Sequence, residues 1–120
     1  MVEEWQETIG WYGTLIEKYP SPQEGMLDFV RWLAASEYAT WMYPSNSHAA
    51  LGLSTVRAYP DRRKRPMVYL AYDSARASFD LIFQEGQGNT ARTEWVTSPR
   101  EPAVMNRIAD WLRRDALFDR

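Results

Sequence analysis

The sequence contains no cysteine and only one histidine, His48, among its 120 residues. Disulfide bonds, thiolate nucleophiles and sulfur-ligated zinc sites are therefore excluded. The acidic residues are scattered along the chain instead of lying at the spacing of metal ligands, so we expect neither a metal site nor a cofactor.

Long apolar runs are also missing, because no stretch approaches the about 18 residues that a membrane-spanning helix needs. The first four residues, 1–4, include two glutamates where a signal peptide would be basic. We therefore expect a cytoplasmic protein that does not enter a membrane.

Neither sign of charge is in large excess, since 14 Lys and Arg residues stand against 16 Asp and Glu residues. This balance argues against a generally basic surface for nucleic acid. No internal repeat or linker is visible, which predicts a single domain over residues 1–120. Aromatic rings, in contrast, are abundant, with six Trp, seven Tyr and four Phe residues. Such rings fill cores and, where they are in surplus, line protein interfaces.

Three segments carry apolar residues at the three- and four-residue spacing of an amphipathic helix. The first covers residues 2–19, the second runs from Pro22 to near Tyr38, and the third begins near Pro102. The sequence Ser21-Pro22-Gln23-Glu24 predicts the start of the second helix, because it offers a side-chain cap, a proline for the first turn and a glutamate that can reach back.

Between the second and third helices the apolar period changes to two, which indicates strands. We predict four strands, Ala50 to Tyr59, Met67 to Asp73, Ala77 to Gln84 and Thr90 to Thr97. Short connections join them into an antiparallel meander. The expected fold is α+β, with two N-terminal helices, a four-stranded antiparallel β-meander and a C-terminal helix, and with the helices packed on one face of the sheet.

Side-chain alternation assigns the strand residues to two faces. A two-residue turn at Ser74-Ala75 would set Leu70 opposite Phe79 and Val68 opposite Leu81. The predicted core face then holds Ser54, Val56, Ala58, Phe79, Leu81, Phe83, Ala91, Thr93 and Trp95.

The second face is predicted to be more apolar than exposure to solvent requires, because it includes Leu53 and several large side chains. Its residues of the types enriched at protein interfaces are Arg57, Tyr59, Met67, Tyr69 and Ile82. Either the chain itself covers this face, or the face docks a partner. Our main hypothesis is a non-catalytic protein-interaction domain that binds a protein partner, or itself as a homodimer, through the second sheet face.

A basic run between Pro60 and Pro66 supports an alternative hypothesis. Its four cations, Arg62, Arg63, Lys64 and Arg65, follow Asp61 in a hairpin loop and would contact phosphates if the protein were a nucleic-acid-associated factor. No helix-turn-helix, zinc-finger or RNA-reading motif accompanies the run, so a solvated loop is the favoured interpretation.

A second alternative is a hydrolase or small-ligand domain with a pocket near His48, between the second helix and the sheet. Ser45-Asn46-Ser47 precedes this histidine, but no nucleophile elbow surrounds either serine, and such a polar stretch is typical of a turn. The segment Gly86-Gln87-Gly88 lacks the lysine of a phosphate-binding loop. The sequence therefore favours a non-catalytic domain over an enzyme.

Overall fold

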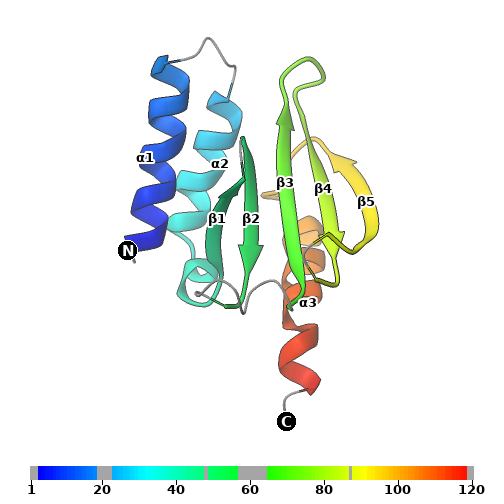
Figure 1. The fold of residues 1–120 in the computed structure, drawn as a ribbon. Coiled ribbons are helices and arrows are strands. Elements are labelled where there is room, and N and C mark those ends of the chain that lie inside the picture. The colour runs from blue at the N-terminus through cyan, green and yellow to red at the C-terminus, as the bar shows by residue number, and fades with distance from the viewer. Residues whose placement is uncertain (1–2, 19–22, 48, 57–64, 87, 119–120) are drawn as a thin grey trace.

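The computed structural model describes residues 3–18, 23–47, 49–56, 65–86 and 88–118. Within them, three α-helices lie beside a five-stranded antiparallel sheet in the order β1-β2-β3-β4-β5 (Figure 1). The elements are α1 (Glu3–Lys18), α2 (Glu24–Ala34), the 3-10 helix η1 (Glu37–Thr40), β1 (Tyr43–Ser47), β2 (Ala50–Ser54), β3 (Met67–Asp73), β4 (Ser78–Gln84), β5 (Thr90–Val96) and α3 (Pro102–Phe118). The predicted α+β meander is confirmed, but the predicted number of strands is wrong.

The strand missing from the prediction is β1, which pairs antiparallel with β2. Its proline and polar residues have low strand propensity, yet an edge strand tolerates proline because one side of its backbone is unpaired. Contacts from α1 fix its position. The Trp5 indole donates a hydrogen bond to the Met42 carbonyl at 3.0 Å, and the Tyr12 hydroxyl donates to the Ala49 carbonyl at 2.9 Å.

Helix boundaries follow the prediction at both ends of the chain and depart from it in α2. This helix begins at Glu24 instead of Pro22, and Gln23 at its N-cap makes no side-chain capping bond. The predicted cap Ser21 and Pro22 lie outside the described residues. The helix ends at Ala34, and the chain reaches Tyr38 through η1 instead of a continuous helix.

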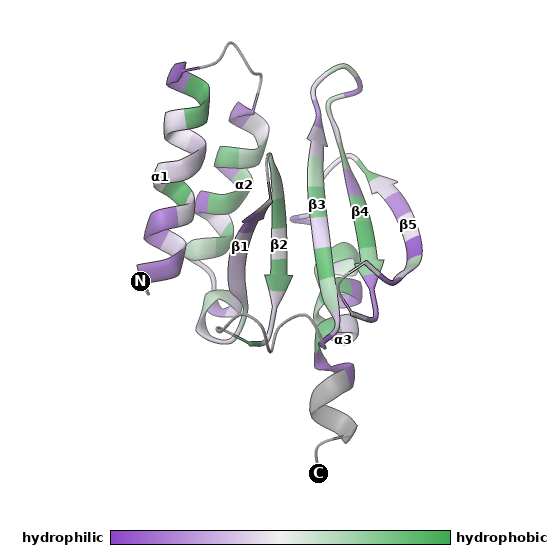
Figure 2. Ribbon diagram, viewed as in Figure 1, coloured by the Kyte–Doolittle hydropathy of each residue, from purple (hydrophilic) through white to green (hydrophobic). Residues whose placement is uncertain are grey.

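All three helices contribute to one hydrophobic core on a single face of the sheet. Phe29 of α2 packs on Phe79 of β4 with 5.8 Å between ring centroids. Trp111 of α3 packs on Phe83 at 5.6 Å, and its indole donates to the Gln84 carbonyl at 2.9 Å. Figure 2 shows green apolar segments along β2, β3 and β4, the strands that contribute buried residues to this core.

The pairing of β3 with β4 keeps the predicted faces but not the predicted register. Leu70 lies opposite Leu81 instead of Phe79. The reason is the turn, which contains the four residues 74–77 instead of two. It closes with Ala77 at a φ of 49°, in the left-handed region that an alanine adopts only when the surrounding turn requires it. Adding two residues to a turn slides the register without exchanging the faces.

The predicted faces of β2 are inverted. Leu53, expected on the second face, pairs with Val68 and is fully buried in the core. Ser54 points to the other face, Val56 lies beyond the end of the strand, and Ala58 is outside the described residues. The prediction carried alternation from β3 across a seven-residue loop, 60–66, whose conformation does not preserve it.

The predicted faces of β5 are inverted as well. Phe83 lies opposite Arg92, and the next pair, Gln84 with Thr90, skips Ala91 at an irregularity of the ladder. The extra residue exchanges the faces, as a bulge does. As a result Trp95, expected in the core, points away from the helices and is 58% exposed.

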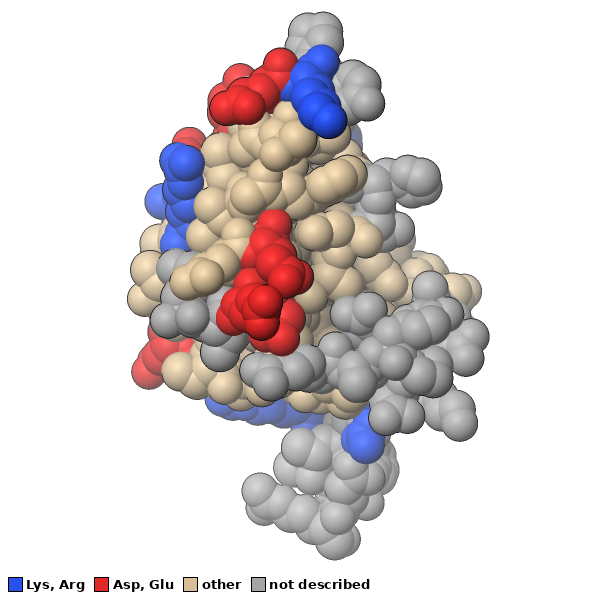
Figure 3. All heavy atoms as spheres, turned by 60° about the vertical axis from the view of Figure 1, so that its left-hand side comes forward, with Lys and Arg blue, Asp and Glu red and all other residues tan. Residues whose placement is uncertain are grey.

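The side of the molecule formed by α1 is acidic. Glu3 and Glu4 lie in the first turn of this helix, and red carboxylates gather on this side in the turned view of Figure 3. This surface is unsuited to phosphate contacts.

The inverted faces give a direct test of the fold. We expect Leu53→Ala to lower the free energy of unfolding by about 2–5 kcal/mol, because a fully buried leucine leaves a cavity. Thr93→Ala, on the exposed side of β5, should cost less than about 1 kcal/mol. Urea denaturation followed by circular dichroism measures both values, and comparable losses in the two variants would contradict the face assignment.

Candidate functional site

The candidate site is the surface of β3, β4 and β5 that points away from the helices, here called the outer face. Its residues are Tyr69, Ala71, Asp73, Asp80, Ile82, Thr93 and Trp95. No helix among the described elements covers it, because the core contacts of α1, α2 and α3 all lie on the opposite face (Figure 1).

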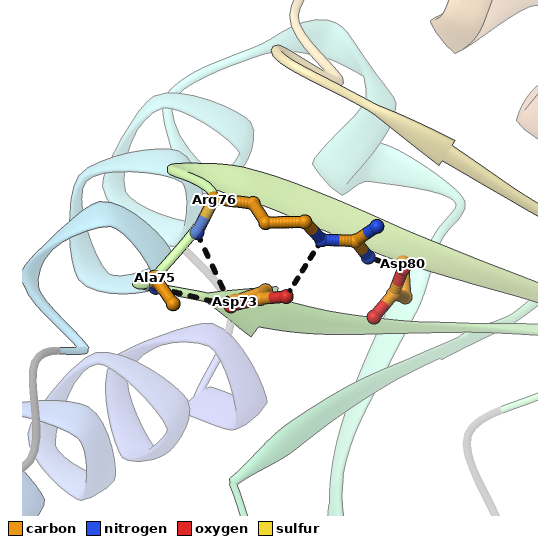
Figure 4. Close-up of polar contacts among 4 residues, drawn as sticks. All are labelled: Asp73, Ala75, Arg76 and Asp80. Carbon is orange, nitrogen blue, oxygen red and sulfur yellow. Dashed lines mark hydrogen bonds and ion pairs between the residues drawn. The ribbon is translucent and has the colours of Figure 1, made fainter.

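The turn between β3 and β4 positions an arginine on this face (Figure 4). One Asp73 carboxylate oxygen accepts hydrogen bonds from the backbone amides of Ala75 and Arg76, at 3.0 and 3.3 Å. The other accepts from Arg76 Nε at 2.9 Å, while Arg76 Nη2 donates to Asp80 at 3.2 Å. The guanidinium carbon lies 5.3 Å from the centroid of the Trp95 ring, within cation–π range. Two carboxylates and an indole thus hold one arginine in place.

Beside this arginine, the outer face is hollowed. A shallow cavity of about 380 Å³ is lined by Asp80, Ile82, Thr93, Glu94 and Trp95. An exposed indole and an isoleucine form its apolar part, and the Asp80 carboxylate stands at its rim. The hollow can accept an apolar side chain and place a donor near its acidic rim.

The structure brings together two of the five residues predicted for protein binding. Tyr69 and Ile82 lie directly opposite each other in the sheet, and both are half-buried. The Tyr69 hydroxyl lies 3.6 Å from the Met67 sulfur, and the side chain of Met67 is buried. Met67 therefore supports the tyrosine from below instead of contacting a partner. Arg57 and Tyr59 lie outside the described residues.

The Tyr69 ring also extends over β2. A Cβ atom on Gly52 would lie 2.9 Å from ring carbon Cε1, so this position has no room for a side chain. Part of the Tyr69 ring therefore packs against β2 and is not accessible to a partner. Trp95 is the most accessible large ring of the outer face among the described residues.

Sequence reasoning missed the two residues that now define the site, Trp95 and Arg76. The prediction of a core position for Trp95 assumed that side-chain alternation continues unchanged from β4 to β5. One signal was available, because Trp95 stands among Arg92, Thr93 and Glu94, and polar neighbours on both faces of a strand are typical of a sheet edge.

A second hollow of about 600 Å³ lies between α1 and the β1–β2 hairpin, lined by Trp11, Leu15, Asn46 and Ala49. The pocket predicted near His48 was expected beside the second helix, whereas this hollow adjoins the first. His48 lies outside the described residues, as do Arg62, Arg63 and Lys64 of the basic run.

The described part of the chain holds no group of three or more His, Cys, Asp or Glu side chains placed to bind a metal ion. Within the same residues, no helix combines the length and apolar character needed to cross a bilayer. Comparison with known family models, curated proteins and solved structures finds no match.

The ion pairs around Arg76 predict a perturbed titration. The Arg76 side chain, aided by backbone amides, holds the pKa of Asp73 below its ordinary value. This stabilising contribution is present above the unfolded-state pKa and is lost as the pH falls through the lower folded-state pKa. In a carboxyl-carbon NMR titration, Arg76→Ala should raise the pKa of Asp73, and Arg100→Ala, a distant control, should not. An unchanged Asp73 titration in Arg76→Ala would contradict the geometry.

Proposed function

We propose that this chain is a non-catalytic protein-interaction domain that binds another protein through its outer face. The observation that carries the proposal is the exposed Trp95 ring, held beside Arg76 and Ile82 at the edge of a hollow. Tryptophan, tyrosine and arginine are the residue types that most often supply the binding energy of protein interfaces.

The organisation of the outer face supports this function. Arg76 is already oriented by Asp73 and Asp80, so binding would cost little of the side-chain entropy that a free arginine loses. Trp95 has only two side-chain torsions to immobilise and offers a large contact area. A face built only for solubility would be polar, as the exposed faces of antiparallel sheets usually are.

The partner that fits this face presents an apolar side chain for the hollow and basic or hydrogen-bond-donating groups for its rim. The Asp80 carboxylate is 46% exposed and favours such groups. A second copy of the chain bound at the same face is the other possible occupant, and the experiment below separates the two.

The test begins with a photoreactive amino acid at Ala71 of β3, on the outer face and away from the edge strand, and in a matched variant at Arg31, on the exposed side of α2. A protein cross-linked from Ala71 alone is then purified, and its affinity for three forms of the chain is measured by calorimetry. We expect Trp95→Ala to weaken binding by at least about 30-fold, as for an interface hot spot. Trp11→Ala should leave the affinity unchanged, because this second exposed tryptophan lies on α1.

Three outcomes would contradict the proposal. They are equal affinity of Trp95→Ala and the unmodified chain, cross-linking from Arg31 as efficient as from Ala71, and a cross-linked product that contains only this chain. Thermal melts check that Trp95→Ala is folded, and an exposed ring should change the melting temperature little.

The hollow beside α1 favours a second candidate function, the binding of a small apolar ligand. Its lining is mainly apolar, and Asn46 supplies a polar group that could orient a ligand. Ligand-observed NMR with a set of small aromatic compounds tests it. Binding that is lost in Trp11→Ala and kept in Trp95→Ala would support this function, and binding unaffected by Trp11→Ala would remove it.

A further inference from the structure

The strand β5 forms one edge of the sheet. It pairs with β4 on one side, and no strand of the described chain pairs with its other side. Five of its seven residues are exposed. An unpaired strand edge presents a row of amide and carbonyl groups that can pair with another strand.

The opposite edge of the sheet does not offer the same opportunity. Strand β1 contains Pro44, which has no amide hydrogen to donate, and α1 lies beside it, tied by the hydrogen bonds of Trp5 and Tyr12 (Figure 1). Among the edges formed by the described residues, β5 is therefore the one at which a regular strand can extend the sheet.

Two copies of β5 can pair antiparallel only in certain registers. Backbone polar groups point alternately to the two sides of a strand, so residues directly opposite each other must have the same orientation. In a symmetric pair, one residue therefore lies directly opposite its own symmetry mate, and the twofold axis runs midway between these two residues. Beyond the irregularity at Ala91, the regular stretch 92–96 offers five central positions, one at each of its residues.

The registers differ in which charged residues of the two copies lie opposite each other. A centre at Arg92 or Glu94 would set like charges directly opposite each other, which is destabilising. A centre at Trp95 or Val96 would leave Arg92 and Glu94 without charged residues of β5 opposite them. A centre at Thr93 sets Arg92 of each copy opposite the partner's Glu94, twice in one interface.

The environment of both charged groups fits this pairing. Arg92 lies with its guanidinium carbon 4.4 Å from the Phe83 centroid and 5.9 Å from the Trp111 centroid, and it forms no ion pair with any described residue. Glu94 bonds to Arg107 at 3.0 Å, and its side chain is still 26% exposed. In the paired sheet, each Glu94 would lie between its own Arg107 and the partner's Arg92.

We propose that a second copy of this chain adds to β5 in antiparallel register centred on Thr93, which joins the two five-stranded sheets into one continuous sheet. A twofold axis perpendicular to the sheet keeps the helices of both copies on one side and both outer faces on the other. The pairing uses a strand edge, whereas the proposed partner site uses the outer face.

Charge exchange tests the register. By sedimentation analysis up to millimolar concentration, the chain should reach twice its mass of 14.0 kDa. Arg92→Glu and Glu94→Arg should each weaken association at least tenfold, because each sets like charges opposite. The double variant with both changes should associate again, and so should an equimolar mixture of the two single variants. Arg31→Glu, on the exposed side of α2, serves as the control and should associate like the unmodified chain.

A cysteine scan gives a second measurement that does not depend on charge, since the chain has no cysteine of its own. Thr93→Cys should form a disulfide-linked dimer under mild oxidation, because residues directly opposite have Cβ atoms about 4.5–5.5 Å apart. Thr90→Cys, on the same strand, should not, since its symmetry mate would lie six residues along the strand, roughly 20 Å away.

A chain that stays monomeric at every concentration would overturn the proposal. So would failure of both the double variant and the mixture to associate, or equal cross-linking by Thr90→Cys and Thr93→Cys. A foreign partner bound through Trp95 by a monomeric chain would overturn the self-pairing alone, and self-pairing without any effect of Trp95→Ala on partner binding would overturn the proposed function alone.

Discussion

The fold depends on one constraint, the alternation of side chains along β3 and β4. Val68 and Leu70 on one strand, and Leu81 and Phe83 on the other, bring four large apolar side chains to the same face. All three amphipathic helices contribute apolar side chains to the core on this face. The residues between, Tyr69 and Ile82 among them, are forced to the outer face by the same geometry.

The outer face carries a different type of chemistry as a consequence. Its large side chains are amphipathic or charged, and they contact one another in pairs, as Arg76 does with Trp95. Such contacts restrain the side chains without removing them from solvent, which suits a surface that meets a partner. The edge strand β5 contributes to both proposals, because its outer residues belong to the face and its inner residues, Arg92 and Glu94, to the edge.

Sequence patterns were sufficient where a strong period extends over many residues, as for the positions of α1 and α3 and for the faces, though not the register, of β3 and β4. They failed where one additional residue decides which face of the sheet the side chains of a strand occupy. The irregularity at Ala91 reverses the faces of β5, and the loop before β3 reverses those of β2. As a result, Leu53 is buried where an outer position was expected, and Trp95 is exposed where a core position was expected. Strand β1 was missed because hydrogen bonds from α1 and pairing with β2, not local propensity, hold Pro44 in a strand. The candidate site was located in part, through Tyr69 and Ile82, because β3 and β4 kept their predicted faces.

The most direct test of an open outer face compares the solvent accessibility of two indole groups. Trp5 is fully buried and donates to the Met42 carbonyl, whereas Trp95 is 58% exposed on the outer face. With a soluble gadolinium chelate added to the isotope-labelled protein, we expect strong relaxation enhancement of the Trp95 indole proton in NMR spectra and almost none for Trp5. Equal protection of both indoles would show that the outer face is covered, which would contradict the proposed docking surface.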